Sequence, residues 1–454
     1  MVRKTKSGLF DSIYADRPYH FVANSEKTDD FVTSRPPPST ESRSPGGLST
    51  VEPETKLSPQ SYIKPFLGFI TDNPTVFHAV DWTAKRLEKE GYIHLSEREA
   101  WNSKLKPGGK YYTSRNGSAI IAFAIGQKYT PGNGIGIVAG HVDALCAKLK
   151  PMPKVPNKAG YVQLGVAPYA GGGVGSTWWD RDLGIGGRVL VKDPYSGTIH
   201  SRLVKLDWPM ARIPTLAPHF GAAASGPFNP ETQTVPIIGL DNSDFLRSEP
   251  NSPTPSKIKA GSFAATQPER LVRVVAEQMA IEDYSSIMNW ELELFDMQPA
   301  QLGGLDREFI FAGRIDDKLC SWAAIEALIA SPDESSPSVI KMVGCFDDEE
   351  VGSFLRQGAR SNFMSSVIER ICEGVAESAQ SESAFKSSSD SPPFGPNLVN
   401  QTIAKSFLVS SDVCHAVNPN FLNVYLENHA PRLNVGVAVS VSPALYPEHV
   451  LSDG

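Results

Sequence analysis

Short apolar runs of strand length recur along this chain, and polar or acidic residues directly follow several of them. Gly134 to Ala139 leads into the motif from Gly140 to Asp143, and Val339 to Cys345 leads into four consecutive carboxylates from Asp347 to Glu350. Segments with helical spacing of apolar residues separate such runs, as from Asp317 to Ile329. Helices that alternate with apolar strands predict an α/β sheet.

Three regions depart from this alternation. Residues 1 to 58 are rich in Ser, Pro, Thr and charge and show no hydrophobic period, so we expect a disordered extension there. Residues Val162 to Ile238 are rich in Gly, Pro and short β-like runs, which indicates a β-rich insertion. The Ser-rich stretch Glu373 to Pro393 is predicted to be a mobile loop.

Composition limits the partners of the chain. With 43 Lys and Arg against 50 Asp and Glu, the formal net charge is −7, and no basic block points to nucleic acid. No apolar run is long enough to predict a membrane span, and the basic N-terminus lacks the apolar segment of a secretory signal. Five scattered cysteines without a CxxC pair favour reduced thiols and a cytoplasmic protein.

His141 and Asp143 lie two apart in an extended segment, so their side chains are expected on the same side. A metal-binding histidine commonly uses a neighbouring carboxylate to orient its ring, a role that suits Asp143. The alternative is an ordinary core or surface histidine beside a turn aspartate. Asp412, which follows the strand-like run Ser406 to Ser410, has two interpretations as well, a metal ligand or a helix cap.

The remaining acidic residues also allow two interpretations. Asp316 and Asp317 stand between a strand and a helix, where a carboxylate often caps the helix. The carboxylates from Asp347 to Glu350 repel one another unless they are solvated or neutralised by cations. They form either a solvated acidic loop or a catalytic pair, in which one of Glu349 and Glu350 binds a metal ion and its neighbour takes a proton from water.

Jointly these residues form a His, Asp and Glu set that suits two zinc ions bridged by one carboxylate. From about Tyr62 to Val441, the chain resembles the M18 metallo-aminopeptidases, and among them the fungal vacuolar aminopeptidase I branch, which is related to aspartyl aminopeptidase. The resemblance rests on the motifs Gly140 to Leu145, Trp179 to Arg188, Arg212 to Phe220 and Asp348 to Ser353, and the vacuolar branch is favoured by Leu216 to Gly221 and Asn418 to Phe421.

The resemblance implies four metal ligands. His141 and Asp412 would bind the first zinc ion, Asp316 would bridge both ions, and Glu350 would bind the second ion. In the family a late histidine also binds the second ion. The sequence from Ser442 to Gly454 departs from the family pattern and contains no residue that corresponds to this late histidine. We therefore expect a truncated catalytic domain that binds the second ion weakly and has little activity.

Three catalytic residues are implied as well. Glu349 would be the general base, and Asp143 would support His141. His219 would reach into a neighbouring subunit's active site and steady the reacting carbonyl. The family fold is a zinc-peptidase catalytic domain with a central mixed sheet flanked by helices, expected here at residues 59–146 and 301–454. A β-rich dimerisation domain is inserted at 147–300, and dimers assemble into a dodecamer.

The favoured hypothesis is therefore a zinc-dependent aminopeptidase that removes N-terminal residues from peptides. The competing hypotheses are a catalytically impaired, truncated member that keeps only the fold and assembly surface, and a two-metal carboxypeptidase or deacylase. The segment Trp179 to Leu183 argues against the second, and Glu349 beside Glu350 argues against a pure binding module.

The substrate's first residue is expected to be neutral or apolar, with an acidic residue as the alternative. The aspartyl branch has a Lys where our alignment has Ser440, and a hydroxyl cannot neutralise a carboxylate. The N-terminal residues lack the helical pattern of the vacuolar branch's propeptide, so we expect a cytoplasmic location, with delivery to the vacuole as a second option.

Overall fold

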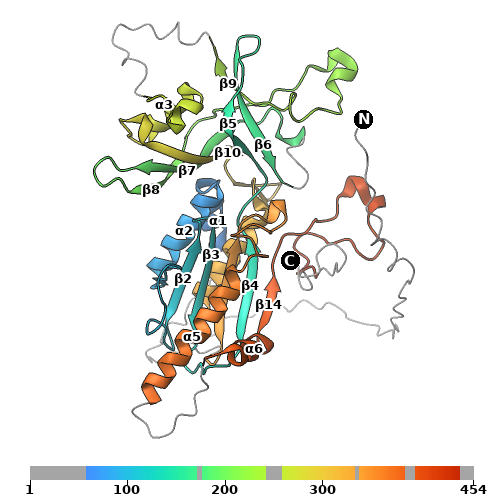
Figure 1. Ribbon diagram of the computed structural model, residues 1–454. Coiled ribbons are helices and arrows are strands. Elements are labelled where there is room, and N and C mark those ends of the chain that lie inside the picture. The colour runs from blue at the N-terminus through green and yellow to red at the C-terminus, as the bar shows by residue number, and fades with distance from the viewer. Residues whose placement is uncertain (1–57, 171–175, 242–257, 333–336, 384–393, 440–454) are drawn as a thin grey trace, which may run out of the picture. The chain divides into compact units, whose positions relative to one another are not determined.

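The computed structural model describes residues 58–170, 176–241, 258–332, 337–383 and 394–439. The predicted disordered extension, residues 1 to 58, therefore lies outside the described residues except for Ser58. The described chain forms two sheets of six strands each (Figure 1). A separate pair of strands, β11 (Gln301–Gly303) and β12 (Phe309–Phe311), is antiparallel.

The first sheet is mixed and has the strand order β1-β2-β3-β13-β4-β14. β4 lies parallel to β13 and β14, whereas β3 runs antiparallel to both β2 and β13. This arrangement confirms the predicted α/β fold with a central mixed sheet. The strand bounds are β1 (Ile93–His94), β2 (Lys110–Arg115), β3 (Ala119–Ile125), β4 (Ile135–His141), β13 (Ile340–Phe346) and β14 (Phe407–Ser410).

Helices cover both faces of the first sheet. Strand β3 shows why its sequence is apolar throughout, because Ile120 and Ala122 belong to one buried cluster while Ile121 and Phe123 belong to the other. Successive strand residues face opposite sides, so a strand covered on both faces leaves no position for a polar side chain. One face carries α1 (Pro59–Asp72), α2 (Val76–Lys89) and α4 (Ile315–Ala330), and the other carries α5 (Phe363–Ser383) and α6 (Pro396–Ala404).

The second sheet is antiparallel, has the order β8-β7-β10-β5-β6-β9, and is built from residues between Cys146 and Asp296. Helix α3 (Glu269–Gln278) packs on it through Leu271, Val272 and Val275. The insertion predicted at 147–300 covers nearly the same residues, and its exact bounds stay a prediction. The strands are β5 (Cys146–Lys154), β6 (Tyr161–Tyr169), β7 (Leu183–Lys192), β8 (Ile199–Lys205), β9 (Ile237–Leu240) and β10 (Ile287–Asp296).

The prediction of a mobile loop in the Ser-rich stretch is wrong for its first part. The Ser-rich stretch Glu373 to Pro393 was expected to be a loop, but α5 continues to Ser383. The reason is that Cys372, Val375 and Ala376 have helical spacing and are buried in the cluster beneath α5. The rest of that stretch lies outside the described residues.

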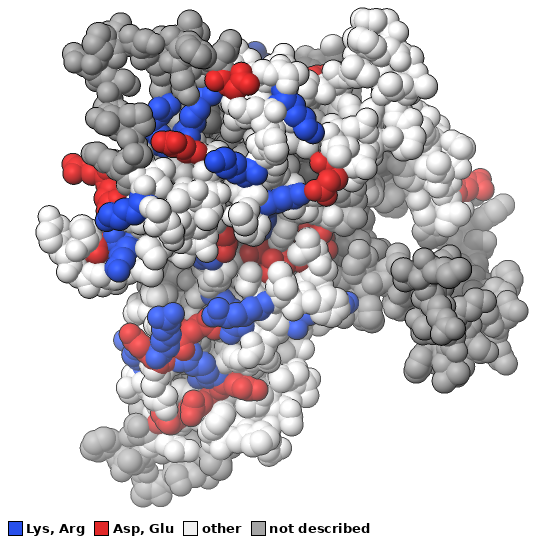
Figure 2. Space-filling model, turned by 45° about the horizontal axis from the view of Figure 1, so that its top comes forward, with Lys and Arg blue, Asp and Glu red and all other residues white. Residues whose placement is uncertain are grey.

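The helices and the surface charges of the molecule bear on its surroundings. In the part of the chain that the structure describes, no helix combines the length and apolarity needed to cross a bilayer. On the face drawn in Figure 2, basic and acidic side chains lie intermingled. This pattern agrees with the near-balance of 43 basic and 50 acidic residues in the chain.

Candidate metal centre

The chain carries four polar motifs. Those that contain His141, Glu349 and Asp412 lie close together because the strands that precede them are parallel neighbours. In the first sheet, Phe346 of β13 pairs with His141 of β4. On the other side of β4, Ser410 of β14 pairs with Ala139. The carboxyl ends of β4, β13 and β14 therefore lie at one edge of the sheet, where α/β enzymes collect their functional residues. The fourth motif enters from the start of α4, where Asp316 and Asp317 have non-helical torsion angles.

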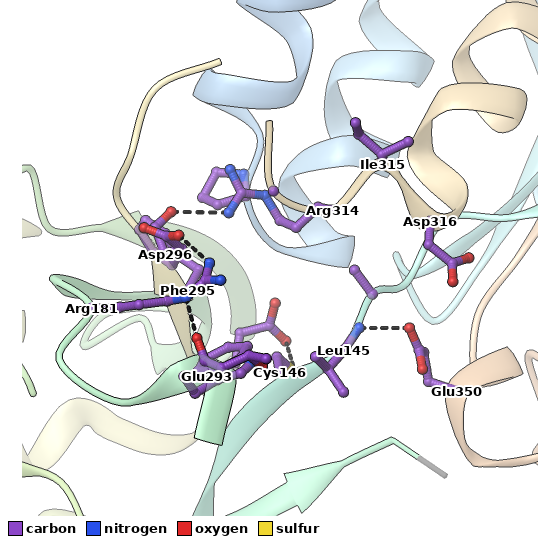
Figure 3. Close-up of a pocket in the computed structure, with 15 residues that line it drawn as sticks. Leu145, Cys146, Arg181, Glu293, Phe295, Asp296, Arg314, Ile315, Asp316 and Glu350 are labelled. Atoms are coloured by element: carbon purple, nitrogen blue, oxygen red, sulfur yellow. Dashed lines mark hydrogen bonds and ion pairs between the residues drawn. The ribbon is translucent and has the colours of Figure 1, made fainter. Parts of the chain in front are cut away.

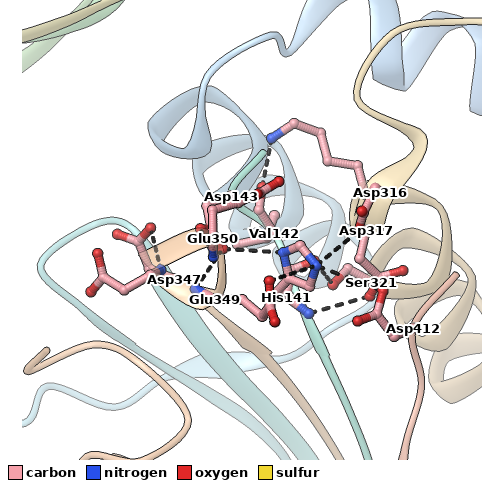
Figure 4. A network of polar contacts seen from close by, with 12 residues as sticks. His141, Val142, Asp143, Asp316, Asp317, Ser321, Asp347, Glu349, Glu350 and Asp412 are labelled. Carbon is pink, nitrogen blue, oxygen red and sulfur yellow. Dashed lines mark hydrogen bonds and ion pairs between the residues drawn. The ribbon is translucent and has the colours of Figure 1, made fainter. Parts of the chain in front are cut away.

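The imidazole of His141 lies at the centre of this edge (Figure 4). Its Nε2 atom is 3.0 Å from Asp316 Oδ1 and 3.7 Å from Asp412 Oδ1. The carboxylate of Glu349 also approaches Nε2, with Oε2 at 3.7 Å. The His141 side chain is buried, whereas that of Asp316 is exposed on its outer side. Together with Asp143 on the other ring nitrogen, the structure thus brings together five of the seven residues that the sequence singled out.

The other atoms of His141 are held by their own partners. Nδ1 lies 3.2 Å from Asp143 Oδ1, as the spacing of the motif predicts. The backbone N–H of His141 donates to Asp317 Oδ2 at 3.3 Å, and its carbonyl accepts from Ser321 Oγ at 2.7 Å. Burial lowers the pKa of His141, but hydrogen bonds to surrounding carboxylates outweigh burial and raise this pKa well above its ordinary value.

The donor set fits a zinc ion. Nε2 of His141 and one carboxylate oxygen each from Asp316 and Asp412 lie within 4.8 Å of one another, and these three are the potential metal-binding group found among the described residues. One imidazole with carboxylates is a usual zinc donor set, and Asp143 orients the ring from its other nitrogen. The surplus of negative charge around His141 is the condition that a cation relieves.

Glu350 points differently from the other expected ligands. Its Oε1 atom accepts a hydrogen bond from the backbone N–H of Leu145 at 2.7 Å. It nevertheless lines the same cavity as Asp316, and burial and the charge of Asp316 raise the pKa of Glu350 to about 7. Figure 3 shows both carboxylates beside this cavity, whose volume is about 360 Å³.

The interpretation of the acidic run as a solvated loop does not hold for its first two residues. Asp347 and Asp348 are only 3% and 2% exposed. Burial raises the pKa of Asp347 to about 7, and it also raises the pKa values of Asp348 and Glu349. Glu349 itself is half-buried and begins the short helix η7 (Glu349–Val351).

Two buried residues of this site, Lys318 and Tyr169, were missed from the sequence, and a third, Asp317, was considered only as a helix cap. Asp317 holds the His141 backbone, and burial raises its pKa to about 8. Lys318 is fully buried, donates from Nζ to the Val142 carbonyl at 2.6 Å, and has its pKa lowered to about 8 by burial. Tyr169 of β6 approaches Asp143 from the second sheet. A lysine within an otherwise apolar helix was a usable signal, whereas nothing in the sequence marks Tyr169.

His219 lies away from the cluster just described. It belongs to the short helix η2 (Pro218–Ala224), is exposed, and stacks on Phe220 with ring centroids 4.7 Å apart. Within one chain no contact joins His219 to the described residues around His141. Its expected action on a neighbouring subunit stays a prediction.

Comparison with known proteins agrees with this geometry. Residues 69–447 match the family described as aminopeptidase I zinc metalloprotease (M18). The chain belongs to the M18 family. As a member of this family it is a hydrolase of the metallo-aminopeptidase class, which confirms the family resemblance seen in the motifs.

Similar M18 proteins come from several fungi. Vacuolar aminopeptidase 1 of Saccharomyces cerevisiae is 40% identical, over 83% of this chain and 70% of its own length. The aspartyl aminopeptidase of Aspergillus oryzae is 38% identical, over 83% of this chain and 76% of its own. The solved structure of Chaetomium thermophilum mApe1 has a TM-score of 0.77 and 57% identity, over 84% of this chain and 81% of that one.

Proposed function

We propose that this M18 protein removes the N-terminal residue of peptides at the centre built by His141, Asp316 and Asp412, with Glu349 as the general base. The observation that carries the proposal is the half-buried Glu349 carboxylate next to these three metal donors. Zinc, when bound, makes a water molecule more acidic and polarises the peptide carbonyl. The residues of the chain orient the reactants and move the protons.

Glu349 has the environment of a base. Its pKa is raised by burial, and a base whose pKa lies nearer to neutral pH transfers protons more effectively. Its backbone N–H points to Asp143 Oδ1 at 3.4 Å, so the residue that orients His141 also fixes the start of η7. In this proposal Glu349 accepts the proton of the attacking water and passes it to the leaving amine.

A second ion between Asp316 and Glu350 is part of the proposal. Both carboxylates border the same cavity, and the charge of Asp316 makes Glu350 harder to ionise. A cation there would offset that repulsion, as in enzymes that use two metal ions. Asp316 would then bridge the ions, since it also faces His141.

For the substrate we propose a neutral or apolar first residue. The cavity next to Asp316 and Glu350 is lined in part by Leu145, Trp178 and Phe295. Its two arginines have partners already. Arg181 pairs with Asp296 at 2.6 Å, and Arg314 donates to the carbonyls of Asp296 and Ile70. Glu293 also lines this cavity, and its carboxylate would repel an acidic side chain.

Similarity to aspartyl aminopeptidases at 38% identity favours the alternative, an acidic first residue. Ser440, on which the sequence argument for a neutral residue depends, lies outside the described residues. For assembly and location we propose a dodecamer built through the second sheet and a cytoplasmic protein, with delivery to the vacuole as the second option. The support is likeness to the Saccharomyces cerevisiae mApe1 dodecamer at a TM-score of 0.68 and 35% identity, and to a vacuolar relative.

The experiment uses the full chain stripped with a chelator and reloaded with zinc. Activity is measured on peptides that differ only in the first residue, Leu, Ala, Asp or Glu, and on an N-acetylated Leu peptide. We expect zinc-dependent cleavage of the Leu peptide, at least about tenfold faster than of the Asp peptide, and none of the acetylated one. Cleavage of the Leu peptide no faster than background would instead support the alternative of a catalytically impaired family member. Faster cleavage of the Asp peptide would overturn the neutral preference, and cleavage of the acetylated peptide would overturn the aminopeptidase assignment.

A further inference from the structure

The hydroxyl group of Tyr169 lies among three buried carboxylates. Its oxygen is 3.1 Å from Asp143 Oδ2, 3.0 Å from Asp348 Oδ1 and 3.3 Å from Asp347 Oδ1. Tyr169 ends strand β6 and is 8% exposed, and each of the three aspartates is less exposed than that. One residue of the second sheet therefore contacts three acidic residues at the edge of the first.

Two of these aspartates, Asp143 and Asp348, are connected directly to the metal centre. Asp143 contacts His141 Nδ1 and accepts hydrogen bonds from the backbone N–H groups of Glu349 and Glu350, at 3.4 and 3.2 Å. Asp348 immediately precedes Glu349 and has a positive φ of 65°, a conformation that a non-glycine residue keeps only when its surroundings hold it. Tyr169 thus contacts Asp143, which supports the metal-binding His141. It also contacts Asp348, which sets the direction of the general base Glu349.

A lysine of the second sheet secures this arrangement. Nζ of Lys148, on the neighbouring strand β5, lies 3.6 Å from the centroid of the Tyr169 ring. A cation over an aromatic face holds the ring in place, and its charge offsets the nearby carboxylates. The hydroxyl of Tyr169 and the positive charge of Lys148 therefore both come from the second sheet, which lies in the predicted dimerisation domain.

We propose that Tyr169 is a positioning residue of the metal centre. Its hydroxyl holds Asp143 and the Asp347–Asp348 segment together, and through them it orients His141 and Glu349. A hydroxyl carries one hydrogen, so it can donate to one of the three carboxylates at a time. Its loss takes one hydrogen-bond donor away from this buried group of carboxylates. The catalytic part of this inference rests on the proposed aminopeptidase function, whereas the metal-binding part does not.

The first test measures zinc affinity and needs no turnover. Tyr169→Phe removes the hydroxyl and keeps the ring under Lys148. Tyr129→Phe is the matched control, because Tyr129 is also buried and donates to the Asn133 carbonyl at 3.0 Å, away from the carboxylates. In competition with a chromophoric chelator, the zinc dissociation constant should rise about tenfold in Tyr169→Phe and stay within about twofold of wild type in the control. Equal constants in the two variants would overturn the inference.

The second test separates kcat from KM in the zinc-loaded full chain. We expect Tyr169→Phe to lower kcat about tenfold with KM nearly unchanged, because a displaced base slows the reaction without weakening substrate binding. Asp348→Ala removes the shortest of the three contacts from its other end and should act in the same direction, which supplies the test if Tyr169→Phe does not fold. If the wild type is active and kcat is unchanged in both variants, the positioning role of Tyr169 is contradicted and the proposed function is not. An inactive wild type contradicts the proposed function, and the zinc measurement still decides the role of Tyr169.

Discussion

His141 has a partner for each of its polar groups. One ring nitrogen faces Asp143 and the other faces the metal donors, while its backbone groups bond to Asp317 and Ser321. Such complete fixation lets the ring present Nε2 in one direction, as metal binding requires. Ligand and base roles at this centre can therefore be separated by single substitutions.

The first prediction compares a ligand with the base. Asp316→Ala removes an oxygen 3.0 Å from His141 Nε2 and should cut the zinc content of the purified protein sharply. Glu349→Gln keeps the shape of the side chain, so zinc content should stay at the wild-type level while kcat falls about a hundredfold or more. Elemental analysis and peptide cleavage check both. Unchanged zinc in Asp316→Ala would mean that Asp316 is not a ligand.

The second prediction concerns pH and zinc-free protein. Folding raises the pKa of Asp347 and Glu350 to about 7 and that of Asp317 to about 8, so above pH 6.5 the folded state holds protons that the unfolded state has released. The raised pKa of His141 acts in the same direction, and these four groups together outweigh Lys318, whose pKa is lowered to about 8 and which acts in the opposite direction. Stability of the zinc-free protein should therefore fall as the pH rises from 6.5 to 8.

Melting temperatures recorded across that range, with and without zinc, provide the measurement. Zinc supplies the positive charge that protons supply at lower pH, so the decline should be smaller in the zinc-loaded protein. A zinc-free melting temperature that stays level or rises from pH 6.5 to 8 would contradict this explanation.

At the scale of elements, the centre depends on how loops are attached to the first sheet. Arg115 on β2 is nearly buried and binds Glu97 through Nη2 at 2.6 Å. Its Nη1 atom donates to the Arg356 carbonyl and to Asn362 Oδ1, and the guanidinium lies 4.4 Å from the ring centroid of Phe363. One side chain thus connects a strand to the segment that leads from η7 into α5.

The third prediction follows from this connection. Arg115→Met should lower the free energy of unfolding by about 3 kcal/mol, because it leaves Glu97 and two further acceptors without their donor. Lys85→Ala is the control, since Lys85 pairs with Asp81 in an exposed position and should matter by less than about 0.5 kcal/mol. Chemical denaturation of both variants measures the difference. Similar losses in the two would show that Arg115 does not anchor this segment.

At the scale of the whole molecule, both sheets contribute to one centre. Tyr169 and Lys148 reach it from the second sheet within the chain. His219 is exposed on η2 and has no contact of its own to that centre among the described residues, so a role for it requires a second copy. Assembly and catalysis are then expected to be linked.

The fourth prediction tests this link by complementation. His219→Ala and Glu349→Gln should each lower activity by about a hundredfold or more, and His219→Ala should leave zinc content unchanged. When the two variants are co-expressed and co-assemble, centres with an intact Glu349 receive His219 from a neighbour. Activity should then rise well above that of either variant alone. Mixed assemblies no more active than the separate variants would place His219 outside the neighbour's reaction.

The sequence by itself determined the fold class, the order of the motifs and the family. Apolar strands with polar residues at their ends predict an α/β sheet with a functional edge, because strand periodicity is a local property. It also identified His141, Asp143 and Asp316 as neighbours. Glu373 to Ser383 was mistaken for a loop, since the burial that stabilises the end of α5 comes from the sheet beneath it.

Only the tertiary structure decided which acidic residues are buried and what holds them. Asp347 and Asp348 look like a solvated run until the second sheet covers them with Tyr169, which is 179 positions from Asp348 in the chain. The contact of Glu350 with the Leu145 backbone likewise joins residues 205 apart. Contacts over such separations leave no local pattern, because burial and hydrogen bonding at these sites arise only when distant segments pack together.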